Sequence, residues 1–208
     1  MNYFEKKKIQ NAPNPKGFWG RKTLRMMNKR HDGLTDWGLS FLSFNEDDKV
    51  LDIGCGGGRT VKKLSKKTTD TVWGVDISSA AIEESFRLNK AAIRRDKVVI
   101  CKADAADLPF GDATFDIITA VETVYFWKDP DKCFREILRV LKSGGQIMIL
   151  TESRSDADHP EKWDDLKKTV DMNIPSADSL ASALTDAGFI AVTAHIRGDG
   201  LCVIAKKR

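Results

Sequence analysis

Residues 50–58 read Val-Leu-Asp-Ile-Gly-Cys-Gly-Gly-Gly, and this stretch decides the fold that we expect. Its first four residues have the character of a short strand covered on both faces of a parallel sheet. The glycines at positions 54, 56 and 58 allow positive φ angles and a close approach of the backbone to a ligand. Helical spacing follows directly in Val61 and Leu64. This order predicts the nucleotide-binding opening of a doubly wound α/β domain.

The spacing of these glycines separates two classes of nucleotide-binding turn. A dinucleotide fingerprint G-x-G-x-x-G that starts at Gly54 would have its third glycine at position 59, which is Arg59. This difference disfavours a nicotinamide cofactor and hence an oxidoreductase. The pattern D-x-G-x-G-x-G after Val50-Leu51 instead resembles motif I of the class I S-adenosylmethionine (SAM)-dependent methyltransferases. A tight turn without a ligand is the simpler alternative for an isolated glycine motif.

Length and composition predict one main domain. The chain has 208 residues, of which 41% are hydrophobic, enough to bury one sizeable core. The four cysteines, at positions 55, 101, 133 and 202, form no C-x-x-C pair, so we expect neither a disulfide framework nor a metal site. No apolar run approaches the roughly 20 residues that span a bilayer, and no apolar signal segment follows Lys6-Lys7-Lys8. We therefore expect a cytoplasmic protein without membrane contact.

The basic residues are concentrated at the start of the chain. Residues 1–30 contain nine Lys or Arg and the single acid Glu5, whereas the whole chain has a net charge of only +4. We treat residues 1–35 as a basic arm that could meet nucleic acid or an anionic substrate. Simple solvation of these charges is the alternative. Within the arm, prolines and glycines around Phe18-Trp19 predict a loop with an apolar tip over residues 11–20.

Two helices are expected between this loop and the first strand. Leu24 and Met27 indicate a short helix. Thr35 can cap a second helix, in which Trp37, Phe41 and Phe44 recur at helical spacing. We interpret this aromatic stripe as part of the core.

The second expected strand, residues 71–76, ends in Asp76. An acid about twenty residues beyond a glycine turn can accept hydrogen bonds from both ribose hydroxyls of a nucleotide. Asp76 could alternatively cap the next helix, which Ser78 or Ser79 begins and which extends through Arg95. The glycine turn upstream leads us to favour ribose binding.

The third expected strand, residues 98–103, precedes Asp104-Ala105 and Leu108-Pro109-Phe110. The Leu-Pro-Phe triplet is typical of the small type 11 branch of the methyltransferase family. The resemblance implies that Asp104 meets the adenine amino group and that the amide of Ala105 meets a ring nitrogen. The full set of expected cofactor contacts is Asp52, Gly54, Cys55, Gly56, Asp76, Ile77, Asp104, Ala105 and Val121.

The fourth expected strand, residues 115–121, opens into the acidic and aromatic segment 122–127. Because this segment follows a strand end on the ligand-bearing edge, Glu122, Tyr125 and Trp127 are candidate substrate contacts, together with Trp19. Packing beneath the next loop is the alternative for the two aromatics of the segment. The acid or Asn, two prolines and aromatic of the family's aminomethylating members are absent here. Their absence argues against DNA exocyclic amines and side-chain amides as acceptors.

The rest of the chain predicts the far side of the sheet. We expect a helix from Pro130 to Gly144-Gly145, a fifth strand over 146–150, a helix around 163–170 that can lie over the site, and a last helix over 176–187. Residues 139–145 resemble the family's sequence before its fifth strand. Segments 189–196 and 201–205 flank Gly198-Asp199-Gly200, which predicts a hairpin. The family has its seventh strand antiparallel, so we expect a Rossmann-like, doubly wound, mostly parallel sheet of seven strands in the order 3-2-1-4-5-7-6, over residues 36–208.

The resemblance implies methyl transfer from SAM. Its sulfonium already activates the methyl group, so the protein mainly has to align donor and acceptor about 3 to 3.5 Å apart and exclude water. We therefore assign no catalytic residue. A general base matters only for a hydroxyl or a protonated nitrogen, and the candidates are Glu122, Glu152, His31 and His159. His195 lies in a strand pattern and is interpreted as structural.

A small-molecule acceptor is favoured because the sequence offers no appended recognition domain. The alternatives are a SAM-binding protein without transfer activity and an RNA methyltransferase that uses the basic arm. We expect the arm to fold over the pocket as a lid, with Phe18 and Trp19 as its apolar face.

Overall fold

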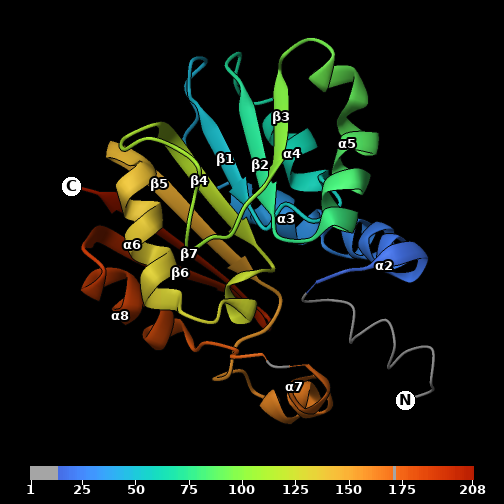
Figure 1. The fold of residues 1–208 in the computed structure, drawn as a ribbon. Helices are drawn as coiled ribbons and strands as arrows, with labels where there is room; N and C mark the ends of the chain where they lie inside the picture. Colours follow the sequence, from blue (N-terminus) through green and yellow to red (C-terminus); the bar gives the residue numbers. More distant parts are fainter. Residues whose placement is uncertain (1–13, 171) are drawn as a thin grey trace.

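The computed structural model describes residues 14–170 and 172–208 (Figure 1). Lys6, Lys7 and Lys8 of the basic arm lie outside the described residues. The centre of the fold is a seven-stranded sheet in the order β3-β2-β1-β4-β5-β7-β6, so the predicted topology is confirmed. The strands are β1 (Val50–Ile53), β2 (Val72–Asp76), β3 (Val98–Lys102), β4 (Phe115–Val121), β5 (Leu141–Thr151), β6 (Phe189–Arg197) and β7 (Gly200–Lys207).

Helices cover both faces of this sheet. The α-helices are α2 (Gly17–Arg30), α3 (Asp32–Leu39), α4 (Arg59–Leu64), α5 (Ser79–Ile93), α6 (Pro130–Val140), α7 (Asp164–Thr169) and α8 (Ala177–Asp186). There are also two 3₁₀ turns: η1 (Val124–Phe126) lies between β4 and α6, and η2 (Pro160–Trp163) lies between β5 and α7. In Figure 1, α4 lies behind β1–β3 and α5 lies beside β3, whereas α6 and α8 lie on the front face of the other half.

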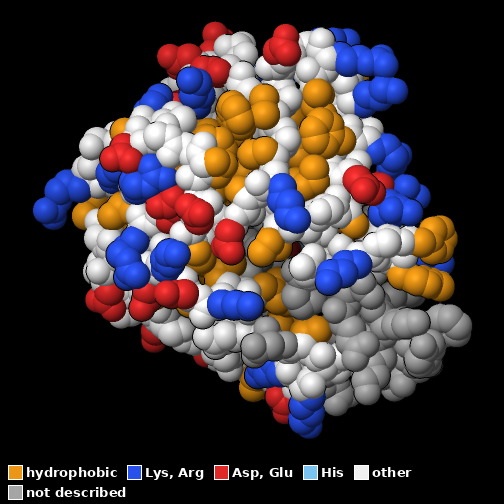
Figure 2. Space-filling model, in the orientation of Figure 1, with side chains coloured by type: hydrophobic (Ala, Val, Ile, Leu, Met, Phe, Trp, Pro, Cys, Tyr) orange, Lys and Arg blue, Asp and Glu red, His pale blue; other side chains and the backbone are white. Residues whose placement is uncertain are grey.

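The core has one part on each face of the sheet. In β1, Val50 packs in the part that contains Val61 of α4, whereas Leu51 and Ile53 pack in the part that contains Phe134 of α6. All four β1 residues are buried, which explains why this strand is continuously apolar apart from Asp52. Among the described residues, no helix lies in front of β1–β3 in Figure 1, and Figure 2 shows apolar side chains gathered over this part of the molecule.

The predicted hairpin is confirmed. β7 pairs antiparallel with β5 on one side, where Leu150 lies opposite Cys202, and with β6 on the other. β1 to β5 pair in parallel with one another. The carboxyl ends of β1, β2, β4 and β5 therefore meet at one edge, which is where a doubly wound sheet holds its ligand.

The predicted loop over residues 11–20 is wrong from Gly17 onward. α2 begins there, so Phe18 and Trp19 lie in its first turn. Gly20 is required because a Cβ at this position would lie 2.8 Å from the backbone carbon of Pro15. Glycines and prolines thus let the chain fold tightly against itself, and contacts with α5 outweigh the low helix propensity.

Two other helix boundaries differ from the predictions. Thr35 lies inside α3 and donates its hydroxyl to His31 O at 2.9 Å, so it does not cap the helix. Phe41 and Phe44 follow the end of α3, yet Phe41 stacks on His195 with ring centroids 3.8 Å apart, in keeping with a structural histidine. α6 ends at Val140 rather than at the glycine pair, because β5 begins at Leu141.

The start of α5 agrees with the sequence. Ser78 is its N-cap, and the Ser78 hydroxyl accepts a hydrogen bond from Ala81 N at 3.2 Å. The helix ends at Ile93, two residues before the predicted Arg95.

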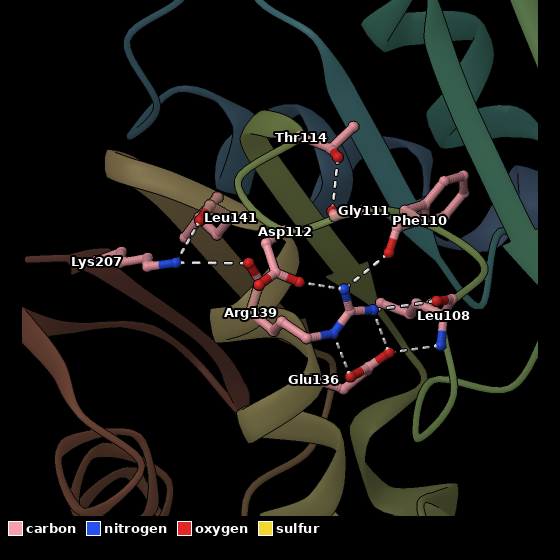
Figure 3. Close-up of polar contacts among 9 residues, drawn as sticks. All are labelled: Leu108, Phe110, Gly111, Asp112, Thr114, Glu136, Arg139, Leu141 and Lys207. Carbon is pink, nitrogen blue, oxygen red and sulfur yellow. Dashed lines mark hydrogen bonds and ion pairs between the residues drawn. The ribbon is translucent and has the colours of Figure 1, made fainter.

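Arg139 in α6 ties the loop after β3 to the rest of the domain (Figure 3). Its guanidinium donates to Phe110 O at 2.8 Å and Leu108 O at 3.2 Å, and it pairs with Glu136. Glu136 in turn accepts a hydrogen bond from Leu108 N at 2.9 Å. Two segments that resemble the family in sequence, 108–110 and 139–145, are therefore joined physically. The arginine fixes the loop that begins with Asp104.

Candidate functional site

A cavity of about 620 Å³ lies at the carboxyl edge of the sheet, within the usual size range for small-molecule sites. The glycine turn, the loop after β3, the segment after β4 and the arm all contribute to its wall. Of the expected cofactor contacts, all but Asp52 line it: Gly54, Cys55, Gly56, Asp76, Ile77, Asp104, Ala105 and Val121. Of the expected substrate contacts, Glu122 and Trp127 line it, whereas Trp19 and Tyr125 do not.

Asp76 holds the glycine turn and also lines the cavity. Its Oδ2 accepts a hydrogen bond from Gly56 N at 2.9 Å, and its Oδ1 accepts one from Ser78 N at 2.8 Å. Burial raises the pKa of Asp76 despite these two bonds. Ser78, not Asp76, is the N-cap of α5. The carboxylate of Asp76 instead joins the glycine turn to the end of β2.

Asp52 lies beneath the turn and is buried. Its Oδ1 accepts a hydrogen bond from Thr119 Oγ1 at 2.6 Å, whereas its Oδ2 has no partner among the described residues. Burial raises the pKa of Asp52 to about 7. An unpaired buried carboxylate oxygen is costly, and a positively charged ligand group that reached it would relieve that cost.

The segment after β4 lies directly against the glycine turn. A Cβ on Gly54, which has φ +68°, would lie 2.3 Å from Thr123 Oγ1. Only glycine therefore allows the β1 turn and residues 122–123 to approach this closely. Glu122 itself has φ +59°, an uncommon angle for a residue with a side chain.

The arm supplies the remaining wall through Leu24, Met27, Asn28 and His31. These residues recur three to four positions apart and so share one face of α2 and its end. The sequence analysis named His31 as a candidate base and placed Leu24 and Met27 in a short helix, but it did not predict that this face lines the site. Their helical spacing is the signal that could have identified this face.

Several polar contacts fix the arm to the domain. Arg25 donates two hydrogen bonds to the buried carboxylate of Glu84, at 2.9 and 3.2 Å. Asn28 Nδ2 donates to Gly57 O at 3.1 Å, so the arm contacts the glycine turn itself. Ser78 Oγ donates to Pro15 O at 2.5 Å.

Three of the four candidate general bases come together at the arm side of the cavity. His31 Nε2 lies 3.4 Å from a carboxylate oxygen of Glu152 and 3.7 Å from one of Glu122. His159 does not join them: it is exposed and pairs with Glu161. Glu122 Oε1 also accepts a hydrogen bond from Glu152 N at 2.5 Å, and Tyr125 donates its hydroxyl to Oε2. We call His31, Glu122 and Glu152 the acid–histidine cluster.

Comparison with known proteins identifies this arrangement. Residues 51–149 match the family model described as a methyltransferase domain of type 11. Residues 51–149 belong to this domain family, and the chain has the fold of the class I SAM-dependent methyltransferases. It is 32% identical over 134 residues to methyltransferase GfsG of Streptomyces halstedii, covering 64% of this chain and 48% of that one. It is 30% identical over 178 residues to cycloartenol-C-24-methyltransferase 1 of Oryza sativa subsp. japonica, covering 82% and 51%.

A solved structure supports the fold independently. The Haloferax volcanii putative methyltransferase, solved in complex with the Trm112 methyltransferase activator, superposes with a TM-score of 0.79 at 22% identity, covering 89% of this chain and 93% of that one. The methyltransferase described here spans about half the length of the curated relatives named above. No helix among residues 14–170 and 172–208 is long and apolar enough to cross a membrane.

The methyltransferase cavity fits the family's cofactor, SAM. The backbone of the glycine turn faces it without side chains, the Asp76 carboxylate is available at one side, and the orphaned oxygen of Asp52 lies below. Asp104 and Ala105, which follow β3, line the same cavity as Glu122, which follows β4 on the other side of β2 and β1. An adenine nucleoside and a charged amino-acid tail have complementary partners in this set.

The acid–histidine cluster of this methyltransferase is suited to holding a proton. Burial raises the pKa of Glu122 to about 7. Burial alone would lower the pKa of His31, but the hydrogen bond to Glu152 and the two negative charges raise it. Burial opposes ionisation of Glu152 as well, yet His31 and Arg30 lower its pKa overall. Glu152 is thus the fixed anion, and the ability to exchange a proton lies with Glu122 and His31.

A metal ion could also bridge a group of this size. One ligand-type atom from each of His31, Glu122 and Glu152 lies within 4.8 Å of the others. However, Arg30 pairs with Glu152 at 2.9 Å, and Tyr125 donates to Glu122. The guanidinium of Arg30 already neutralises Glu152, and the pKa of His31 is raised, so a proton on His31 suits this group better than a metal ion. We therefore do not identify His31, Glu122 and Glu152 as metal ligands.

Proposed function

We propose that this protein transfers the methyl group of SAM to a small-molecule acceptor that enters the cavity beside Glu122. One observation carries the proposal: a single cavity extends from Asp104 past the glycine turn to Glu122 and His31. The nucleotide end and the acid–histidine cluster are therefore two ends of one site. When bound, SAM supplies a methyl group on a positively charged sulfur.

The residues of the chain then bind, orient and enclose the reactants. Asp76 accepts hydrogen bonds from the ribose, Asp104 and Ala105 hold the adenine, and the glycine turn and Val121 border the rest of the cofactor. Thr123 and Trp127 remain for the acceptor. The curated relatives support a small acceptor, since one is named for the carbon that it methylates in cycloartenol.

The arm acts as the lid of this site. It closes the cavity with the apolar side chains of Leu24 and Met27 rather than with Phe18 and Trp19, which are 68% and 38% exposed. All three of its arginines are used within the molecule: Arg21 pairs with Glu83, Arg25 with Glu84 and Arg30 with Glu152. Arginines engaged in this way are less available to RNA phosphates, so we favour the lid over the RNA-methyltransferase alternative.

Replacing Asp76 with alanine should weaken SAM binding about ten- to a hundredfold. The variant loses charge-assisted hydrogen bonds to the ribose, worth roughly 1.5 to 3 kcal/mol, and releases the amide of Gly56. Titration calorimetry with SAM measures the change. Asp76→Asn, which keeps one acceptor oxygen, should lie between the variant and the parent protein. Unchanged affinity in Asp76→Ala would remove this residue from the site.

Replacing Arg25 with alanine should weaken SAM binding about tenfold, the equivalent of about 1.4 kcal/mol, because the lid loses two bonds to Glu84. Arg87 offers a matched control, since it binds the same carboxylate from α5 rather than from the arm. Arg87→Ala should leave SAM affinity within about twofold. Hydrogen exchange should also accelerate over residues 17–30 in Arg25→Ala only. Equal effects of the two substitutions would contradict the lid.

The proposed function itself is tested in two steps. Calorimetry with SAM comes first, and the absence of binding would refute the proposal. The protein is then incubated with methyl-labelled SAM and a cell extract, and labelled products are identified by mass spectrometry. We expect a labelled small molecule. Binding without any labelled product would instead support a SAM-binding protein without transfer activity.

A further inference from the structure

The acid–histidine cluster has a geometry that the binding of SAM does not explain. Glu122 is held at both carboxylate oxygens, by Glu152 N and by the hydroxyl of Tyr125. Its side chain is only 4% exposed, yet it lines the cavity. Burial of a carboxylate this deeply is costly, and the two hydrogen bonds and the nearby His31 offset only part of that cost, so Glu122 takes up a proton more readily than an exposed carboxylate does.

Glu122 lies beside the glycine turn, at the wall of the cavity. The residue follows β4, and its neighbour Thr123 touches the glycine turn where Gly54 lacks a side chain. The left-handed backbone of Glu122 is the local strain that accompanies this position. His31, whose side chain is 12% exposed, closes the same end of the cavity from the arm. Glu152 does not line the cavity and instead holds His31.

We propose that Glu122 is the proton acceptor of the transfer reaction and that the methyl acceptor is an amine or a hydroxyl compound, in which the attacking nitrogen or oxygen carries a proton. This inference rests on the proposed function. His31 is the charge partner of Glu122, and Glu152 and Arg30 are positioning residues. The acceptor's nitrogen or oxygen forms a bond to the methyl carbon, the carbon–sulfur bond breaks with its electron pair staying on sulfur, and the acceptor's proton passes to Glu122.

The pH dependence follows from the groups that face Glu122. These are His31 after α2, Glu152 after β5 and Tyr125 in η1, and Arg30 of α2 pairs with Glu152 rather than with Glu122. Burial raises the pKa of Glu122 to about 7, so its carboxyl is protonated in more acidic solution and accepts no proton there. The rate of a single turnover should therefore rise between about pH 6 and pH 8. In Glu122→Gln this rise should be lost.

The experiment compares three proteins: the parent, Glu122→Gln and the control His159→Asn. The control alters the exposed His159–Glu161 pair, which has the same chemistry but lies outside the cavity wall. Calorimetry with SAM is measured first, and all three should bind SAM within about threefold of one another. Failure of the parent protein to bind SAM would refute the proposed function. The role of Glu122 is refuted by other outcomes, in the transfer assay and in the NMR titration.

Transfer is then measured with labelled SAM against amines, phenols and alcohols, against thioethers and alkenes, whose attacking atom carries no acidic proton, and finally against a cell extract. We expect label on nitrogen or oxygen, with a loss of roughly 10²- to 10⁴-fold in Glu122→Gln and none in the control. Comparison of the amines with the phenols and alcohols shows whether nitrogen or oxygen is the attacking atom. No label at all would refute the proposed function itself. Label only on carbon or on a thioether sulfur, or a Glu122→Gln rate within threefold of the parent, would overturn the inference.

A readout without cofactor tests the pairing itself. The chain has three histidines, so each ring can be followed by NMR during a pH titration. Glu122→Gln should lower the pKa of His31, because a negative neighbour is removed, and His159→Asn should not change it. The titration is repeated with EDTA and with added Zn²⁺ or Mn²⁺. An unchanged His31 in Glu122→Gln, or micromolar metal binding that Glu122→Gln abolishes, would overturn the assignment.

Discussion

Replacing Gly58 with valine is expected to lower the free energy of unfolding by roughly 3 to 5 kcal/mol. Gly58 has φ +77° at the start of α4, and a Cβ there would lie 2.3 Å from Ser85 Oγ and 2.9 Å from Ser85 Cα. The second contact is with helix backbone, which cannot move aside cheaply. Separating α4 from α5 would also break the hydrogen bond from Asn89 to Gly58 O. Urea unfolding measures the loss.

Gly56→Val is the matched control for this prediction. Gly56 also has a positive φ, +50°, but the nearest atom to a Cβ there is Leu24 Cδ2 at 3.6 Å. The valine would therefore add only backbone strain of roughly 1 to 2 kcal/mol and project toward the cavity. This variant should keep its fold and bind SAM more than a hundredfold more weakly. Similar stability losses at the two positions would show that strain, rather than contact with α5, determines the cost.

Asp52→Asn is expected to make the ligand-free protein more stable at pH 8. Burial raises the pKa of Asp52 from 3.8 to about 7, so the folded state holds this proton more tightly than the unfolded state. The stability that the proton gives is complete below about pH 4 and is lost as the pH rises through about 7. At roughly 1.4 kcal/mol per pH unit, the loss has an upper limit near 4 kcal/mol. Asparagine removes it, so the dependence of stability on pH should flatten.

Thr119→Val provides the converse test. The Thr119 hydroxyl donates to Asp52 Oδ1 and lowers the pKa of this acid, so its removal should steepen the dependence on pH. Glu122 contributes a similar slope in all variants, since its pKa is also raised by burial. Thermal unfolding of the three proteins between pH 4 and pH 8 measures these differences. Parallel curves for the parent and Asp52→Asn would show that Asp52 ionises normally.

Local sequence signals predicted the sheet well because each strand depends on its own residues. The apolar run of β1 and the Gly198-Asp199-Gly200 turn are short-range features, and they led to the correct strand order through the family resemblance. The arm was misjudged because its structure depends on tertiary contacts. The local sequence of residues 11–20 does not show that Arg25 binds Glu84 or that Gly20 packs against Pro15.

In the candidate site, too, the contacts that depend on local sequence were predicted and those that depend on tertiary structure were not. Eight of the nine expected cofactor contacts line the cavity, since they follow strand ends at fixed spacing. The acid–histidine cluster combines residues 31, 122 and 152 from three distant segments, so the sequence could name its members but could not bring them together. It also could not separate them from His159, because only burial and distance make that distinction.

The place of β7 has a consequence for synthesis on the ribosome. This strand is the last of the seven in sequence, yet it lies between β5 and β6. While residues 200–207 are still inside the exit tunnel, β5 has no partner on that side. The β6–β7 hairpin can form locally as it emerges, whereas its docking on β5 joins residues 50 to 60 positions apart and is the slower step. A nascent chain paused at residue 199 exposes β5 as an open edge, where neighbouring chains on a polysome can pair with it.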